Sequence, residues 1–230
     1  MSKKSGPAPS LFEDEAQPSR HPEPLNTGAV LLRGFARSQA EALIREIGSV
    51  SSSSPFRHML TPGGYQMSVA MTNCGALGWV TDRSGYRYQA IDPQTGHPWP
   101  RMPIIFRQLA EHAATAAGFA EFRPDACLIN RYAMGARMGL HQDKDEQDLS
   151  APIVSVSLGL PAVFLFGGMT RSERPRRIRV ENGDVVVWGG PARLTFHGVA
   201  PLAEGEHPLT GRYRFNLTFR KAGVSQGQYK

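Results

Sequence analysis

The feature that most limits the fold of this chain is a series of short, evenly spaced β-type segments from residue 126 onward. The candidate strands are CLINRYA, PIVSVSLGL, AVFLFGG, RRIRV, DVVVWGG, LTFHGVA and RYRFNLTFR. Short antiparallel strands separated by turns are typical of a sandwich, a barrel or a jelly roll. Asn182-Gly183, between RRIRV and DVVVW, predicts a hairpin that joins these two segments.

The last segment, residues 214–220, alternates strictly between polar and apolar side chains. Its apolar members, which must face a core, are Phe215, Leu217 and Phe219. Its polar members are Arg214, Asn216, Thr218 and Arg220. A solvent-exposed polar face is the ordinary interpretation. Arginine also binds carboxylates through two parallel hydrogen bonds, so the same face suits a dicarboxylate ligand. Asn130 and Tyr132, on one face of CLINRYA, add an amide and a phenol.

Three residues have the side chains of a mononuclear iron site. His141 and Asp143 are two apart, so in an extended segment both point the same way. His197 lies well downstream in LTFHGVA. Two imidazoles and one carboxylate form the triad that holds one face of a non-haem Fe(II). H-x-D is frequent by chance, and a lone histidine is more often a hydrogen-bonded core or surface residue, so the motif needs support from the rest of the chain.

Two helices are expected outside the strands. Residues 38–41 have the form of a capping box, apolar residues follow at helical spacing, and Gly48 can end that helix. A second helix is predicted over residues 103–117, closed by Gly118. Residues 61–102 contain too many glycines and prolines for a helix, so we expect short hairpins that act as a lid or a binding loop.

Composition limits the partners and the compartment. Residues 1–24 are rich in proline, serine and charge, which predicts a mobile tail. No signal peptide or membrane-spanning run is found, and two isolated cysteines suit a reducing compartment, so a cytoplasmic protein is expected. The net charge of +6 permits an anionic partner such as nucleic acid.

The motifs together resemble the AlkB family of alkylated-nucleobase dioxygenases. They are NRYAMGARMGLHQDKDE, APIVSVSLGLPAVFLFGG, DVVVWGG, FHGV and RYRFNLTFR, with TPGGYQMSVAMTNCG and GWVTDRSGYRY upstream. The resemblance runs from about residue 25 to about residue 223. It implies a mainly β, α+β fold with flanking helices: a double-stranded β-helix (jelly roll) core over residues 126–220 and a nucleotide-recognition lid over 61–102. Residues 25–223 would form one domain, followed by a C-terminal tail, 224–230.

The resemblance also implies a role for each site residue. The iron ligands, and with them the catalytic residues, would be His141, Asp143 and His197. Arg214 would clamp the distal carboxylate of 2-oxoglutarate and Arg220 would lie near the other, with Asn130, Tyr132 and Asn216 as further partners. Trp79 and His141 would sandwich the damaged base, and Asp145 and Arg171 would line its pocket. Thr61, Tyr65 and Tyr86 would hold backbone phosphates.

The implied reaction is oxidative dealkylation of bases such as 1-methyladenine and 3-methylcytosine. It would use Fe(II), 2-oxoglutarate and O2 and release aldehyde, succinate and CO2. The expected partner of a monomeric enzyme is alkylated single-stranded DNA, with duplex DNA and RNA left open. Two alternatives remain: a dioxygenase of the same class acting on a small molecule or a protein side chain, and a jelly-roll binding module that has lost its metal.

Overall fold

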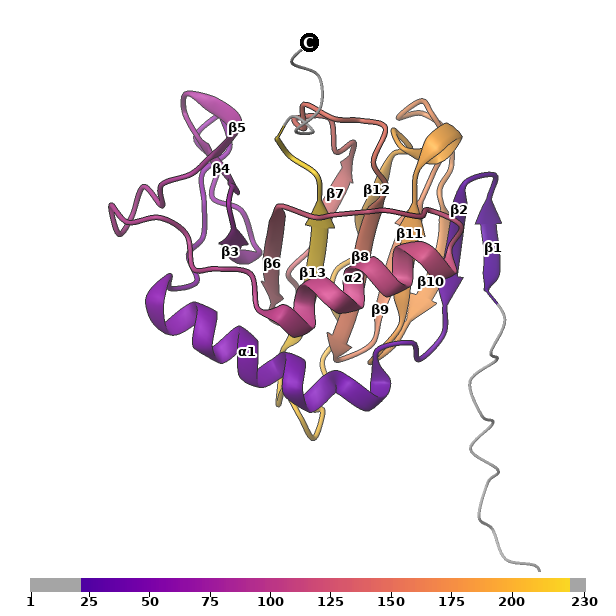
Figure 1. Ribbon diagram of the computed structural model, residues 1–230, viewed down its shortest axis with the longest axis horizontal. Coiled ribbons are helices and arrows are strands. Elements are labelled where there is room, and N and C mark those ends of the chain that lie inside the picture. The colour runs from indigo at the N-terminus through magenta and orange to yellow at the C-terminus, as the bar shows by residue number, and fades with distance from the viewer. Residues whose placement is uncertain (1–21, 224–230) are drawn as a thin grey trace, which may run out of the picture.

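Two antiparallel β-sheets form the body of the protein, in a computed structural model that describes residues 22–223 (Figure 1). The seven-stranded sheet has the order β1 (Glu23–Asn26), β2 (Ala29–Leu32), β11 (Val185–Trp188), β8 (Ile153–Gly159), β13 (Arg214–Arg220), β6 (Ala126–Tyr132) and β3 (Ala70–Gly75). The four-stranded sheet has the order β10 (Arg176–Val180), β9 (Ala162–Phe166), β12 (His197–Val199) and β7 (Met138–His141). Two facing sheets with this crossing order confirm the predicted jelly roll.

The two predicted helices cover the outer face of the large sheet (Figure 1). α2 (Ile104–Ala116) follows Pro103 and ends before Gly118, whose φ of +88° suits glycine, as predicted. α1 (Ala40–Ser53) differs from its prediction at both ends. It follows a 3₁₀ turn, Arg37–Gln39, without a side-chain cap, and it continues through Gly48. A glycine inside a helix costs only about 1 kcal/mol, which the buried face of α1 can offset.

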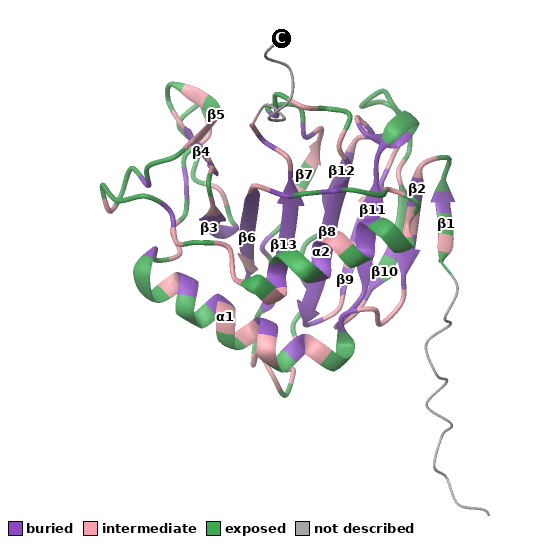
Figure 2. Cartoon of the chain, in the orientation of Figure 1, coloured by how far each residue is buried: buried purple, intermediate pink, exposed green. Residues whose placement is uncertain are grey.

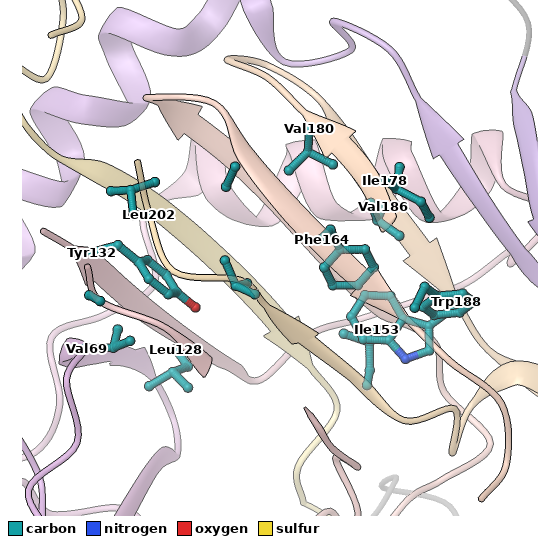
Figure 3. Close-up of a cluster of buried hydrophobic side chains, with 14 of the residues drawn as sticks. Val69, Leu128, Tyr132, Ile153, Phe164, Ile178, Val180, Val186, Trp188 and Leu202 are labelled. Carbon is teal, nitrogen blue, oxygen red and sulfur yellow. The ribbon is translucent and has the colours of Figure 1, made fainter. Parts of the chain in front are cut away.

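Apolar side chains fill two layers on either side of the large sheet. One layer lies between the two sheets and includes Leu128, Phe164 and Trp188 (Figure 3). The other lies between the large sheet and the helices, whose outward faces are exposed (Figure 2). β13 separates the layers as its alternation predicted: Leu217 and Phe219 are fully buried on the helix side. Its polar residues face the other way and are buried too, so the surface-strand interpretation is wrong.

The hairpin predicted at Asn182-Gly183 is not formed. β10 pairs with β9, whereas β11 pairs with β2 and β8, so the two flanking strands belong to different sheets. The turn itself exists, because the Asp184 amide donates to the Glu181 carbonyl and Gly183 has a φ of +88°. Asn182-Gly183 therefore specifies a tight turn, but the strands on its two sides pair with other strands and not with each other.

The segment 61–102, predicted to be a lid, contributes in part to the large sheet. Its residues Ala70–Gly75 form β3, the edge strand of the large sheet beside β6. The predicted hairpin follows as β4 (Gly78–Asp82) and β5 (Gly85–Gln89), which stand to one side of the two sheets (Figure 1). The Trp99 indole holds the end of this hairpin by donating a hydrogen bond to the Gln89 carbonyl at 2.9 Å.

Three strands were not foreseen, namely β1, β2 and β7. β1 begins inside the stretch predicted to be a mobile tail, and its Leu25 is buried. The remainder of both predicted tails, residues 1–21 and 224–230, lies outside the described residues. Within residues 22–223, no helix is both long enough and apolar enough to cross a membrane.

Candidate active site

Three possible metal ligands converge at one end of the small sheet. His141 ends β7 and His197 begins β12, and the antiparallel register places them directly opposite each other. Asp143 lies just beyond β7 in the following loop. Ligand atoms of the three side chains all lie within 4.8 Å of one another. Each imidazole Nε2 is 3.6 Å from a carboxylate oxygen of Asp143. The predicted triad is therefore assembled.

The backbone fixes which nitrogen of each imidazole faces the centre. Nδ1 of His141 lies 2.9 Å from the Gly139 carbonyl, and Nδ1 of His197 lies 3.0 Å from the Thr195 carbonyl. A carbonyl oxygen only accepts, so each Nδ1 carries the proton and each Nε2 keeps its lone pair. This is the arrangement that a metal-binding histidine requires.

The charges of the triad also suit a cation. The His141 side chain keeps 38% of its surface exposed, yet desolvation of its ring and the neighbouring His197 lower its pKa to about 4. Burial by itself raises the pKa of Asp143, but the Arg220 guanidinium and the neighbouring His197 and His141 together outweigh burial and hold that pKa well below 3.8. Near neutral pH the centre thus offers an uncharged His141 imidazole and an ionised carboxylate.

The polar face of β13 forms one wall of a pocket beside the triad. This pocket lies between the sheets and is also lined by Asn130 and Tyr132 of β6. Arg214 is 2% exposed, and its Nη2 donates to Ser157 Oγ at 3.0 Å. Its Nε and Nη1 have no hydrogen-bond partner among the described residues. Burying a guanidinium with unused donors is costly, so the pocket is suited to a carboxylate.

Asn216 is held firmly within the same wall. Its amide nitrogen donates to Ser155 Oγ and to the Val156 carbonyl, at 2.8 and 3.0 Å. Its Oδ1 accepts from Asn130 at 3.3 Å and from Thr218 at 2.8 Å. Both amide protons of Asn216 are therefore committed to the protein. Asn130 Oδ1, in contrast, has no partner among the described residues and remains available.

Arg220 connects this pocket to the triad. Its Nε and Nη2 donate to Asp143 Oδ2, at 3.0 and 2.6 Å. Both side chains are less than a tenth exposed. The pair orients the carboxylate, because a buried Arg–Asp contact with two hydrogen bonds has little freedom to rotate.

The lid hairpin reaches the loop that follows β7. Trp79 Nε1 donates to Asp145 Oδ2 at 2.9 Å, and the Tyr86 ring stacks on the indole with centroids 5.6 Å apart. The other predicted lid residues lie outside this contact. Thr61 Oγ1 accepts from the Tyr65 amide and Tyr65 is 78% exposed. Arg171 is exposed in the loop between β9 and β10. The hydrogen bond of the indole goes to Asp145 and not to His141.

Sequence reasoning missed four residues that support the site: Ser157, Tyr88, Glu146 and Arg193. Tyr88 lies in an aromatic segment where cross-strand packing is the ordinary role, and Glu146 lies in the run DKDEQD, which has the composition of a solvated loop. Arg193 is buried and donates to the Asp143 and Ala151 carbonyls. No local pattern distinguishes any of these residues, since their partners lie far away in the sequence.

A His–Asp–His set on a jelly roll, beside a buried arginine with unused donors, defines a non-haem Fe(II) dioxygenase that takes a 2-oxo acid. Comparison with known proteins agrees. Residues 28–220 match the model of the 2OG-Fe(II) oxygenase superfamily. The alpha-ketoglutarate-dependent dioxygenase AlkB of Escherichia coli (strain K12) is 64% identical over 94% of this chain and 99% of its own length. That of Salmonella typhimurium is 62% identical over the same shares.

A solved structure agrees as well. The structure of OsALKBH1 superposes with a TM-score of 0.76 at 30% identity, covering 87% of this chain and 99% of that one. The chain belongs to the 2OG-Fe(II) oxygenase superfamily and, within it, to the AlkB family. It is a 2-oxoglutarate-dependent dioxygenase, and its cofactor set is Fe(II), 2-oxoglutarate and O2. The intact donor set excludes the alternative of a binding module without its metal ligands.

Proposed function

We propose that this dioxygenase removes alkyl groups oxidatively from nucleobases of the 1-methyladenine and 3-methylcytosine type in single-stranded DNA. The observation that carries the proposal is the aromatic lid: Trp79 and Tyr86 stack on each other, and the indole donates to Asp145 in the loop that also bears Asp143. A flat ring can be held by such a surface next to the triad. Stacking is worth about 1–3 kcal/mol per base and tolerates any sequence, which suits a repair enzyme.

His141, Asp143 and His197 hold the iron in this proposal, through the nitrogens and the carboxylate described above. Arg214 binds the distal carboxylate of 2-oxoglutarate with its unpaired Nε and Nη1. Arg220 lies beside the metal-proximal carboxylate while it orients Asp143. The remaining co-substrate contacts come from Asn130 and Tyr132, and Asn216 keeps Asn130 in place.

The base enters between Trp79 and His141, so Trp79 must leave the position it has here. Its hydrogen bond to Asp145 then breaks, which frees that carboxylate to accept from an exocyclic amino group of the base. Arg171 closes the pocket from the side of the β9–β10 loop. Thr61, Tyr65 and Tyr86 hold the flanking phosphates; the exposed Tyr65 and Tyr86 hydroxyls can donate to them. A damaged base pairs poorly and is cheaper to extrude, which adds selectivity.

Bound Fe(II), 2-oxoglutarate and O2 together supply an oxidation that hydroxylates the N-alkyl carbon, after which aldehyde leaves and the base is restored. The protein supplies placement. Arg214 and Arg220 fix the co-substrate, the triad fixes the metal, and the lid excludes water from the oxidised carbon. Buried hydrogen bonds along β13 keep these groups rigid, which orientation-dependent chemistry requires.

We further propose that residues 25–223 act as one domain, that the enzyme is a monomer and that it works in the cytoplasm. Cys74 and Cys127 are both free and buried, which suits a reducing compartment. Light scattering of the purified protein tests the monomer directly.

The deciding experiment is a turnover assay read by mass spectrometry. The protein is incubated with Fe(II), 2-oxoglutarate, ascorbate and a single-stranded oligonucleotide with one 1-methyladenine, beside a His141→Ala control. The expected result is loss of the methyl mass in the wild type alone, with an equal amount of succinate. Succinate without demethylation would move the activity to a small molecule or a protein side chain. Absence of both from iron-loaded protein would reject the proposal.

A further inference from the structure

One hydrogen bond joins a residue of the lid hairpin to a residue of the loop that carries the metal ligand Asp143. Tyr88 of β5 donates to Glu146 Oε1 at 2.7 Å. Glu146 lies three residues after Asp143, in the loop that follows β7. We propose that Tyr88 and Glu146 are positioning residues at the two ends of this bond: Tyr88 anchors the lid to the loop, and Glu146 holds the arginines that orient the iron-binding carboxylate. The effect on nucleic acid rests on the function proposed above, whereas the effects on the lid and on the metal do not.

The hairpin register explains why the lid has two attachments to this loop. Trp79 and Tyr88 are direct cross-strand partners, so their side chains lie on the same face of the hairpin. They contact consecutive residues of the loop, Asp145 and Glu146. The hairpin thus meets the loop along one edge, through an indole donor and a phenol donor.

The two attachments differ in their surroundings. The contact between Trp79 and Asp145 lies at the surface, where water can replace it. The Glu146 side chain is 1% exposed, so the bond to Tyr88 is partly buried and its acceptor is shielded from water. Breaking a shielded bond leaves a buried group without a partner, which costs more than breaking an exposed one. The Trp79 contact can therefore open while the Tyr88 contact holds the hairpin in place.

Glu146 transmits this restraint because it also binds two buried arginines. Its Oε2 accepts from Arg193 Nη2 at 3.1 Å, and its Oε1 lies 3.3 Å from Arg220 Nε. Both guanidiniums also bind Asp143: Arg220 binds its carboxylate, and Arg193 its carbonyl, at 2.7 Å. Two cations thus hold two carboxylates in one cluster. A shift of Glu146 must move the groups that orient the metal ligand.

Glu146 also balances charge beside the metal. With both carboxylates ionised, the cluster of Asp143, Glu146, Arg193 and Arg220 is neutral before a cation binds. Neutralising Glu146 leaves one extra positive charge near the triad. A divalent cation would then bind more weakly, because like charges repel strongly where water is excluded.

Two substitutions test the roles of Tyr88 and Glu146 separately. Tyr88→Phe removes the phenol donor and leaves Glu146 and its arginines intact. Glu146→Gln keeps an acceptor oxygen for Tyr88 but removes the negative charge. The matched controls are Tyr213→Phe and Glu204→Gln, at exposed positions outside the described site.

The first measurement is hydrogen–deuterium exchange of the hairpin, residues 78–89, in the metal-free protein. Tyr88→Phe should raise its exchange rate about 5-fold, as expected for the loss of a partly buried hydrogen bond to a carboxylate. Glu146→Gln and the controls should leave it within about 2-fold of the wild type. The second measurement is Mn²⁺ binding. Glu146→Gln should raise the Kd about 10-fold, while Tyr88→Phe should not.

The third measurement is the ratio of succinate to aldehyde with the methylated oligonucleotide in the presence of ascorbate. It should rise in Tyr88→Phe alone, because a loose lid places the alkyl carbon less well and ascorbate then supplies the electrons that the substrate would have given. Wild-type exchange in Tyr88→Phe, or wild-type Mn²⁺ affinity in Glu146→Gln, would overturn the inference. If even the wild type forms no aldehyde, the proposed function fails, and the exchange and Mn²⁺ measurements still decide whether the connection exists.

Discussion

At the scale of single residues, Arg214 combines full burial with two donors that no described group satisfies. Lysine keeps the charge but cannot reproduce the planar, two-point contact. We expect Arg214→Lys to raise the KM for 2-oxoglutarate about 10- to 100-fold, since a charged hydrogen bond is worth about 1.5–3 kcal/mol. Initial-rate kinetics with Arg212→Lys as the exposed control measure this. An unchanged KM would place the distal carboxylate elsewhere.

A second residue, Asp92, makes the stability of the fold depend on pH from outside the site. It is fully buried and binds Arg57 and Ser54. Burial by itself raises its pKa, but the hydrogen bonds from Arg57 and Ser54 and from the Gln94 amide outweigh burial and lower the pKa from 3.8 to about 2. Its stabilisation, about 2 kcal/mol, is thus complete above pH 3.8 and is lost as the pH falls towards about 2.

To isolate the contribution of Asp92, the free energy of unfolding in urea is measured for the wild type and for Asp92→Asn between about pH 5 and about pH 2. The substitution should be destabilising near pH 5 and should flatten the dependence on pH below 3.8. Parallel curves for the two proteins would show that Asp92 has the same pKa folded and unfolded.

The residues that sequence reasoning placed well share one property: their pattern is local. The alternation along β13 assigned Leu217 to a core and Arg214 to the opposite face, and the backbone period of a strand guarantees this. The contacts of Glu146 and Arg193 could not be foreseen in the same way. Each joins segments that only the folded topology brings together, and the run DKDEQD has the composition of a solvated loop.

At the scale of elements, the turn at Gly183 shows how local chemistry can be right while the pairing is wrong. The Gly183 amide donates to the Ser157 carbonyl, and its carbonyl accepts from the Ala36 amide. The turn is thus docked between β8 and the segment before α1. Turn residues specify a reversal of the chain, but the partner of each strand is chosen by burial and register. β7 was not predicted because the stretch AMGARMGL contains two glycines and has the composition of a turn. Its pairing with β12 is specified by burial and register and not by local sequence.

Substitution at this turn should be unusually costly. A Cβ at position 183 would lie 2.6 Å from backbone atoms of Arg37, and the φ of +88° disfavours any side chain. We expect Gly183→Ala to destabilise by about 2–4 kcal/mol, from left-handed strain together with overpacking. Gly96→Ala is the matched control, because Gly96 has a φ of +73° and no neighbour within 4 Å. Equal losses in the two variants, measured by urea unfolding, would rule out the clash.

At the scale of the whole molecule, the net charge of +6 is partly concentrated beside the mouth of the site. Arg171, Arg174 and Arg177 are exposed on the β9–β10 hairpin, and none forms a salt bridge within residues 22–223. Phosphate contacts release bound counterions, so log(kcat/KM) for an oligonucleotide should fall linearly with log salt. Replacing all three arginines by alanine should reduce that slope by about 2. A slope of zero in the wild type would contradict a polyanionic substrate.

The position of β13 has a consequence for synthesis on the ribosome. It is the last described strand to be made, yet it lies in the interior of the large sheet, between β8 and β6. Until it emerges, β8 and β6 each present an unpaired edge, and Asp143 lacks the guanidinium of Arg220. A nascent chain therefore contains all three iron ligands before it contains the arginine that orients Asp143. The carboxylate reaches its final geometry only when the end of the folded domain has left the ribosome.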